Sequence, residues 1–288
     1  MIGIVGALTS ALGFGTANVV IKRSLSNLSI PQTLMMSTLS GAFFMSIFIL
    51  LNGASERVTT NLLLLSFVFA VAEVILYLVL YKTFSVSNVT VATAVSGTYP
   101  IIATLFTVIV LSETIDISSF SFILLIVLGA ILTSIRWEDV FKKGFNQGDL
   151  VQGFPWIIAT TLIHSLYFPL LGNFTERGSW EIKLLLIKLF SALILFSVFF
   201  LIRKQTILPP KQKVPFTSLL GLLEVIGWAG YTWATSSTEG RTGVIIATLN
   251  SAALVTAVWA YFVLEEKLSK LQYTGILIIV ASVTALSL

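Results

Sequence analysis

The sequence predicts an all-α polytopic membrane protein, in which ten transmembrane helices form two inverted five-helix repeats around a central cavity. The first observation is composition: the 288 residues are 56% hydrophobic and only 10% charged, and their mean hydropathy is +0.98. Soluble domains are typically about 25% charged, so no water-soluble fold of this length could bury so much apolar surface. The second and third observations are an internal repeat and two glutamates inside apolar stretches.

The first half of the chain holds five apolar segments. A helix needs about 20 apolar residues to cross the hydrocarbon core, and these segments meet or approach that length. They cover residues 2–21, 31–52, 62–84, 89–111 and 119–135. The first segment begins without a charged n-region, so we interpret it as a membrane helix rather than as a cleaved signal.

The second half holds five more apolar segments of similar length. They cover residues 149–172, 182–202, 215–238, 242–264 and 270–287. The longest polar connection, RWEDVFKKGFNQGD, separates the halves and predicts units of residues 1–143 and 144–288. The paired prolines of RKQTILPPKQKVP mark a second clear linker, because proline cannot continue a helix.

The two halves resemble each other in sequence. VIVLSETIDISSFSFILLIVLGA aligns with AYFVLEEKLSKLQYTGILIIVASV when Glu113 is placed on Glu266, and a small shift brings Glu73 onto Glu224. Any two apolar helices look somewhat alike, but chance does not readily match both a loop glutamate and a buried one. Because each repeat has an odd number of helices, the second copy would enter the membrane with opposite polarity. Inverted repeats of this kind indicate a transporter, with its substrate site at mid-membrane between the repeats.

Each of the two buried glutamates is followed, four positions later, by an aromatic residue. Glu73 precedes Tyr77, and Glu224 precedes Trp228, with Tyr231 continuing that stripe. Residues four apart share a helix face, so these side chains can line one cavity. Ring faces attract ammonium groups and a carboxylate supplies the counter-charge, which favours binding of a cation or coupling to protons. The alternative is that each glutamate is protonated and only bonds a neighbouring helix.

Four further polar or aromatic residues in the apolar segments are candidates for the site. His164 lies in the middle of ATTLIHSLYFPLL, where it can relay protons or contact substrate, or can be a satisfied interior polar group. Asn18 and Asn250 have no evident partner in the sequence, and Asn250 falls where the first repeat has Gly97. Tyr99 is a candidate wall residue. We expect these side chains to line the cavity.

The chain resembles the EamA type of the drug/metabolite transporter superfamily over essentially its whole length. ALGFGTANVVIKRSL is similar to the family's first-helix pattern, with Phe14 and Gly15 where Trp-Gly is usual and Lys22 at the family lysine. LSETID and LEEKLSKLQYTGILII resemble the Gly-Glu turn before the last helix of each repeat, although Ser112 and Glu265 replace its glycine. The resemblance implies ten helices, a central cavity and alternating access. It also makes Phe14 a candidate site residue.

Composition excludes several other kinds of site. The chain has no cysteine and a single histidine, so disulfides, thiol chemistry and a His-cluster metal site are not expected. The net charge is +4, but the lysines and arginines cluster in short loops, and no nucleic-acid motif accompanies them. We expect no cofactor, no metal and no nucleic-acid partner; a small-molecule substrate and the lipid bilayer are the expected partners.

The loop charges bear on orientation. Most lysines and arginines lie in loops after odd-numbered segments, whereas Lys183 and Lys188 are assigned to the border of a loop after an even-numbered one. Positive loops stay in the cytoplasm, which would place both termini outside. Ten-helix relatives usually have both termini inside, so the two arguments leave the orientation open.

Together these patterns predict a secondary active transporter in the cell (plasma) membrane that moves a small polar metabolite by alternating access. An amino acid or an amine is the favoured substrate, with a proton or another ion as coupling partner. No G-x-x-x-x-G-K-[ST] loop is present, so direct ATP drive is not expected.

Three alternatives stay open. Aromatic side chains also stack on rings, which makes a neutral sugar or nucleoside-type metabolite the alternative substrate. An intramembrane enzyme using His164 would need a second polar cluster near one membrane face. A passive channel would need a continuous polar stripe. We find neither of those two features in the sequence.

Overall fold

The computed structural model describes residues 2–86, 96–134, 147–238, 241–264 and 270–287, and every regular element in those ranges is a helix. The first half contributes α1 (Ile2–Leu25), α2 (Ile30–Asn52), α3 (Thr60–Val86), α5 (Tyr99–Val110) and α6 (Ile117–Ser134). Local sequence sets several helix ends. Ser29 and Gln32 form a capping box at the start of α2, and Gly53 ends that helix in the left-handed conformation, which glycine adopts without strain.

The second half contributes α8 (Gln147–Thr175), α9 (Trp180–Leu195), α10 (Val214–Ser236), α11 (Thr242–Leu249), α12 (Ala252–Leu264) and α13 (Lys270–Ser287). A π-helical turn, η1 (Phe196–Ile202), extends α9, and a short 3₁₀ turn, η2 (Lys211–Lys213), leads into α10. Ser179 caps α9 by accepting a hydrogen bond from the backbone of Ile182.

The helices have the length and composition of membrane spans. Within the described residues, six helices are long and apolar enough to cross a bilayer: α1, α2, α3, α8, α9 with η1, and α10. Four shorter apolar helices begin at Tyr99, Ile117, Thr242 and Lys270. Large apolar side chains face outward along the helices, Leu64 and Phe43 among them, as they do on a lipid-facing surface. These features confirm an all-α polytopic membrane protein.

One predicted helix is broken. The sequence suggests a continuous helix over residues 242–264, but α11 ends at Leu249 and α12 begins at Ala252. At the break, the Ser251 and Leu254 amides donate to carbonyls only three residues back, so the ladder of i to i−4 hydrogen bonds is interrupted. Broken helices inside a membrane are tolerated where they line a cavity or pack within protein.

The predicted fourth helix, residues 89–111, lies partly outside the described residues. Its described part contains a turn at Gly97 and Thr98, followed by α5. In the alignment that places Glu113 on Glu266, Gly97 falls on Asn250, so the turn of the first repeat and the helix break of the second lie at equivalent positions.

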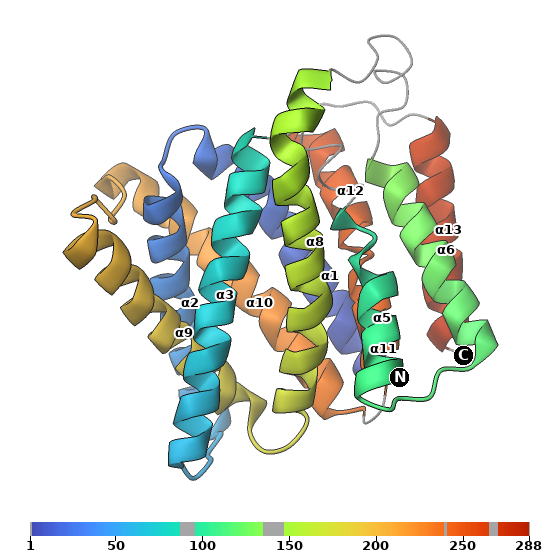
Figure 1. Cartoon of the computed structure of the whole chain (residues 1–288), viewed down its shortest axis with the longest axis horizontal. Helices are drawn as coiled ribbons and strands as arrows, with labels where there is room; N and C mark the ends of the chain where they lie inside the picture. The colour runs from blue at the N-terminus through green and yellow to red at the C-terminus, as the bar shows by residue number, and fades with distance from the viewer. Residues whose placement is uncertain (1, 87–95, 135–146, 239–240, 265–269, 288) are drawn as a thin grey trace.

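The helix packing has an approximate two-fold symmetry that exchanges the two halves (Figure 1). The first helix of one half packs on the third helix of the other: α1 lies along α10, and α8 lies along α3. In the same way α2 contacts α10 while α9 contacts α3, and α6 pairs with its own counterpart α13. In Figure 1, α1 begins near the marked N-terminus while α8 begins at the opposite end of the bundle, and both chain termini lie at the same end. This arrangement is that of two inverted five-helix repeats.

Glycines allow the helices of different repeats to approach closely. A Cβ atom on Gly6 would lie 2.7 Å from the Gly230 carbonyl oxygen, and one on Gly13 would overlap the backbone of Gly227. Small residues commonly line helix contacts in membranes for this reason. The α1–α10 contact therefore fixes one wall of the space between the repeats.

Candidate functional site

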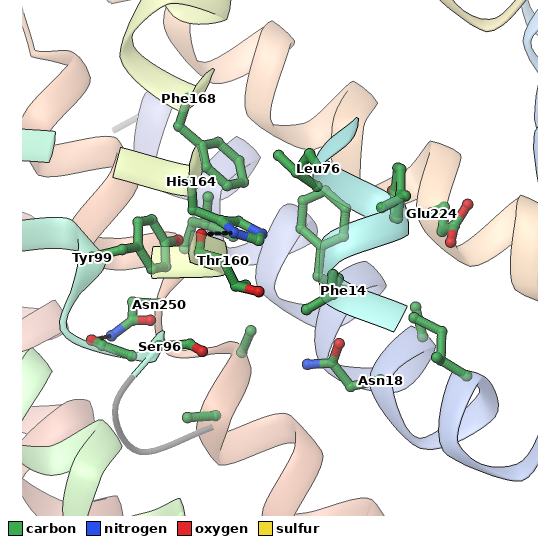
Figure 2. A pocket seen from close by; sticks show the side chains of 18 of the residues that line it. Phe14, Asn18, Leu76, Ser96, Tyr99, Thr160, His164, Phe168, Glu224 and Asn250 are labelled. Atoms are coloured by element: carbon green, nitrogen blue, oxygen red, sulfur yellow. Dashed lines mark hydrogen bonds between the residues drawn. The ribbon is translucent and has the colours of Figure 1, made fainter. Parts of the chain in front are cut away.

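A cavity of about 130 Å³ lies between the repeats (Figure 2). Residues of α1, α3, α8 and α10 line it, together with residues around the turn at Gly97 and the helix break at Asn250. Eight of the ten residues expected from the sequence line it: Phe14, Asn18, Tyr77, Tyr99, His164, Glu224, Trp228 and Asn250. The other two, Glu73 and Tyr231, are buried next to it. Both halves of the chain thus contribute to a single chamber.

Glu224 is the carboxylate that lines this cavity. It lies in the middle of α10 with 2% of its surface exposed, and it accepts a 2.9 Å hydrogen bond from the Tyr81 hydroxyl. The carboxylate also interacts with the Ser37 hydroxyl and, electrostatically, with Lys188 and Glu73. No lysine or arginine of the described segments forms an ion pair with it. The group is therefore available to a cation that enters the chamber.

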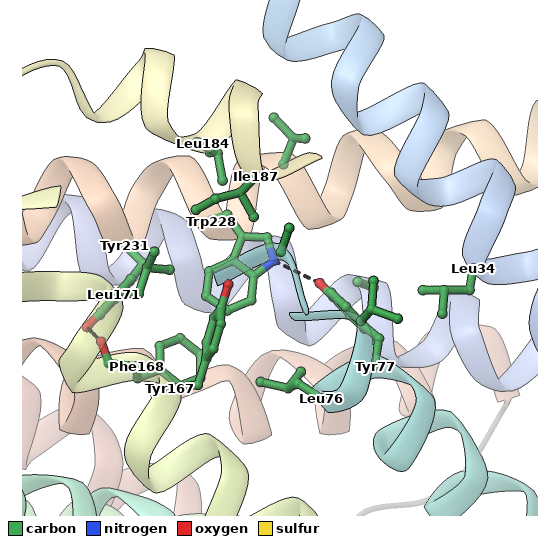
Figure 3. Close-up of a cluster of buried hydrophobic side chains, with 14 of the residues drawn as sticks. Leu34, Leu76, Tyr77, Tyr167, Phe168, Leu171, Leu184, Ile187, Trp228 and Tyr231 are labelled. Atoms are coloured by element: carbon green, nitrogen blue, oxygen red, sulfur yellow. Dashed lines mark hydrogen bonds between the residues drawn. The ribbon is translucent and has the colours of Figure 1, made fainter. Parts of the chain in front are cut away.

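Aromatic rings form one wall of the cavity. Trp228 is buried, and its Nε1 donates a 2.8 Å hydrogen bond to the Tyr77 hydroxyl (Figure 3). Phe14 contacts the Trp228 ring edge-on at a centroid distance of 4.9 Å, and Phe168 stacks against it at 5.1 Å. These contacts hold the rings in place, so their faces and edges are presented to the chamber as a rigid surface.

Glu73 lies behind this wall and not in the cavity lining. Its Oε1 accepts a 2.6 Å hydrogen bond from the Lys188 ammonium, and its Oε2 accepts one of 2.8 Å from Ser191. Glu73 is 2% and Lys188 1% exposed. The assignment of Lys188 to a loop border is therefore wrong: it lies within α9, where the carboxylate of α3 balances its charge. Intramembrane charges usually pair in this way.

Tyr231 positions Phe168 without entering the lining. Its buried hydroxyl donates a 2.5 Å hydrogen bond to the Phe168 carbonyl oxygen, and its ring packs edge-on against Phe168 at 5.0 Å. Tyr231 thus links α10 to α8 at Phe168, one of the residues of the aromatic wall.

His164 lies across the chamber from Glu224 in Figure 2, beside Tyr99 and Phe168. Its Nδ1 is 2.7 Å from the Thr160 carbonyl oxygen of the same helix. Its ring centroid lies 5.6 Å from that of Tyr99 and 5.8 Å from that of Phe168. One imidazole nitrogen is therefore engaged locally, and the ring belongs to an aromatic stack.

The turn at Gly97 and the helix break at Asn250 meet at the cavity. Asn250 Nδ2 donates a 3.0 Å hydrogen bond to the Gly97 carbonyl oxygen, which joins the interrupted segments of the two repeats. Asn18 Nδ2 lies 3.5 Å from the Thr256 hydroxyl, a long contact that also links the repeats. Discontinuous helices at the substrate site are a recurring feature of transporters built from inverted repeats.

Some lining residues were not expected from the sequence. Among them, Phe168 and Thr160 lie one turn on either side of His164, and Leu76 and Ser96 lie next to Tyr77 and Gly97. The spacing of four residues from His164 was a usable signal for the first two. Lys188 had a signal as well, because WEIKLLLIKLF places it more than two turns inside an apolar helix. In the described residues no three His, Asp or Glu side chains are grouped to hold a metal.

Comparison with known sequences identifies the family. Two segments, residues 1–135 and 151–288, match the EamA-like transporter family, and together they include nearly the whole chain. The chain belongs to the EamA-like transporter family. This EamA protein is therefore a multi-pass membrane protein and a transporter of the drug/metabolite transporter type, as the resemblance of its motifs indicates.

Structural comparison supports the fold. A solved crystal structure, described only as that of a protein, is 15% identical to this EamA protein and superposes with a TM-score of 0.74. The match covers 98% of this chain and 94% of the other. At this identity the likeness shows a shared fold. No curated protein matches the sequence significantly.

Proposed function

We propose that this EamA protein is a secondary active transporter that carries a small amine-bearing metabolite across the cell membrane by alternating access. Its two units are residues 1–143 and 144–288, which rock about the chamber between them. The observation that carries the proposal is the position of Glu224: a carboxylate without an ion-pair partner among the described residues lines a cavity walled by aromatic rings. A carboxylate and ring faces together suit an ammonium group.

The extent of the cavity supports an opening toward one membrane face. Its lining follows α3 from Leu76 to Phe84, and α1 from Phe14 to Ile21, so it runs from mid-membrane toward the ends of both helices. Toward the opposite face, the chain is held together by the contact of Tyr231 with Phe168 described above. A chamber open on one side and closed on the other is one half of an alternating-access cycle.

Glu224 can also provide the coupling. A carboxylate that holds either a proton or the substrate ammonium, but not both, exchanges one for the other across the membrane. Such a transporter uses proton flow in one direction to drive its amine in the other, without a second ion site. The Glu224 carboxylate would therefore serve both substrate binding and proton coupling.

Uptake by proteoliposomes tests this function. We expect a pH gradient of the right sign to drive accumulation of a labelled amine, with candidate substrates chosen by a thermal-shift screen of amines, amino acids, nucleosides and sugars. Glu224→Gln should bind amines weakly and lose gradient-driven uptake. Normal gradient-driven uptake by Glu224→Gln would end the coupling role.

One observation favours a second substrate class. Tyr99 and Phe168 stack with ring planes 20° apart at 5.6 Å, and the amides of Asn18 and Asn250 line the same cavity. A neutral sugar or nucleoside-type metabolite could place its ring against this surface. Glu224→Gln separates the classes, because it should leave the binding of a neutral ring almost unchanged.

A further inference from the structure

The buried pair of Glu73 and Lys188 lies directly behind the substrate chamber. The Lys188 ammonium lies 5.4 Å from the ring centroid of Tyr77 and 6.0 Å from that of Trp228, the two hydrogen-bonded rings of the cavity wall. It also interacts electrostatically with Glu224. The charge of Lys188 thus affects the electrostatic potential in the chamber, although its side chain is 1% exposed and does not line the cavity.

The repeats differ at this position. The offset that places Glu73 on Glu224 also places Ser37 on Lys188, and the helices that carry them pack in equivalent ways, α9 on α3 and α2 on α10. Glu73 therefore faces a lysine while Glu224 faces a serine, which can donate a hydrogen bond but carries no charge. A single substitution between the repeats makes their two carboxylates unequal.

The charges of the three groups can be added. With both carboxylates ionised, Glu73 and Lys188 cancel, and Glu224 is left as one unbalanced negative charge. Both oxygens of Glu73 are already engaged, one by Lys188 and one by Ser191. A solute with one positive charge would neutralise the site. A second positive charge in the same apolar surroundings would have no counter-charge, which is costly within a membrane.

We propose that Lys188 determines the specificity of the chamber, by occupying Glu73 and so limiting the site to solutes with a single positive charge. This inference rests on the proposed function, since it specifies the charge of the substrate that binds at Glu224. Lys188 acts through Glu73 and through the electrostatic potential of the chamber, without touching the solute. Removing the lysine leaves Glu73 as a second negative charge behind the wall, and the potential of both carboxylates then favours a dication in the chamber.

The test compares two probes of equal chain length, pentylamine and its diamine counterpart cadaverine, for binding to the purified full-length protein. The wild-type protein should bind pentylamine at least about tenfold more tightly than cadaverine. Lys188→Met, which keeps an unbranched side chain one atom shorter and removes its charge, should reverse this preference. The double variant Glu73→Gln/Lys188→Met removes both charges and should bind the two amines as the wild type does.

Lys188→Met leaves Glu73 without its partner and can prevent folding. A second comparison tests the role of Lys188 in that case as well. Glu73→Gln alone leaves Lys188 as an unbalanced cation near Glu224, and it should weaken pentylamine binding at least about tenfold. Adding Lys188→Met to that variant should restore the binding. A structural role of the pair would affect thermal stability but not the ratio of the two affinities in folded protein.

The outcomes separate this inference from the function on which it rests. A folded Lys188→Met protein with the wild-type preference, or a Glu73→Gln protein with wild-type affinity for pentylamine, overturns the role of Lys188 and leaves amine transport standing. A wild-type protein that binds neither amine overturns both the amine substrate and the role of Lys188.

Discussion

Glu73 and Glu224 occupy equivalent positions in the two repeats, yet their surroundings give them different chemistry. Glu73 is paired with Lys188 and Ser191, whereas Glu224 lines the cavity and is held by the hydroxyl of Tyr81. The sequence pattern that marks both as intramembrane acids cannot separate them. The difference depends on side chains from α9 and α2, which are distant in sequence.

Trp228→Phe should weaken solute binding by about fivefold, because it keeps an aromatic ring but removes the N–H that fixes the wall to Tyr77, a bond of about 1 kcal/mol. Binding of the transported amine by isothermal titration calorimetry measures the effect. Trp259→Phe is a matched control: its Nε1 also donates a hydrogen bond, to Thr16, but the side chain is 42% exposed and lies outside the cavity lining. Equal losses in the two variants would contradict a specific role of the Trp228 wall.

Eight residues of the cavity lining were accessible to sequence reasoning, for a physical reason. A polar side chain in an apolar helix is costly against lipid, so Asn18, His164 and Glu224 were expected inside the bundle, and they line the cavity. Leu76 and Phe168 carry no such signal, because apolar residues serve equally well against lipid and in a cavity. The pairing of Lys188 was missed because a position near a predicted helix end made it look like a loop residue.

At the scale of helices, the glycine contact between α1 and α10 should be intolerant of side chains. Gly13→Ala should lower the free energy of unfolding by about 1–3 kcal/mol, because its Cβ would overlap the backbone of Gly227, which cannot move aside. Gly41→Ala is the control, since its Cβ would come no closer to another atom than 3.2 Å, the distance to a Val225 methyl group. Thermal unfolding in detergent compares them, and a Gly13→Ala protein as stable as Gly41→Ala would argue against a fixed α1–α10 wall.

Glu113 forms a cap that joins the repeats. Its carboxylate accepts hydrogen bonds from the backbone amides of Thr242 and Gly243, at 3.0 and 3.2 Å, at the first turn of α11. Glu113→Gln should destabilise the protein by about 1 kcal/mol, since an amide has a single acceptor oxygen and no charge for the helix dipole. Glu181→Gln, in the first turn of α9, should cost less, because Glu181 accepts from the Ser179 hydroxyl. Equal melting temperatures for the two variants would contradict the cap.

Helix positions were predictable and helix interruptions were not. Hydropathy detects apolar length, and the described helices agree with the segments of residues 2–21, 31–52 and 62–84 to within a few residues. The break at Asn250 and Ser251 leaves hydropathy unchanged. It is stabilised by a partner from the other repeat, the Gly97 carbonyl, which a local sequence pattern cannot reveal.

At the scale of the whole molecule, the loop charges make a prediction about orientation. Exposed Ser26 follows Lys22 and Arg23 between α1 and α2, whereas exposed Ser55 lies in the next loop, between α2 and α3. Because positively charged loops stay in the cytoplasm, a membrane-impermeant maleimide applied to intact cells should label Ser55→Cys and not Ser26→Cys. The chain has no native cysteine, so each variant offers a single thiol. The reverse labelling would place both termini in the cytoplasm.

The inverted repeat is where sequence reasoning reached furthest. Matching Glu113 with Glu266 and Glu73 with Glu224 predicted a two-fold arrangement of helices, and the exchange of α1–α10 for α8–α3 contacts has that symmetry. The substrate could not be predicted to the same depth. In our proposal, selectivity depends on positions where the repeats differ, such as Ser37 and Lys188, and an internal alignment gives such positions no weight.

Cysteine protection tests most directly that one solute chamber is shared by both repeats. Asn18→Cys and Ala253→Cys place a single thiol in the lining from each half of the chain. Both should react with a cationic methanethiosulfonate reagent, and the amine that gives the largest thermal shift should slow both reactions at least about tenfold. Ser26→Cys should react without protection. Protection of one lining cysteine but not the other, or of neither, would contradict a chamber shared by the repeats.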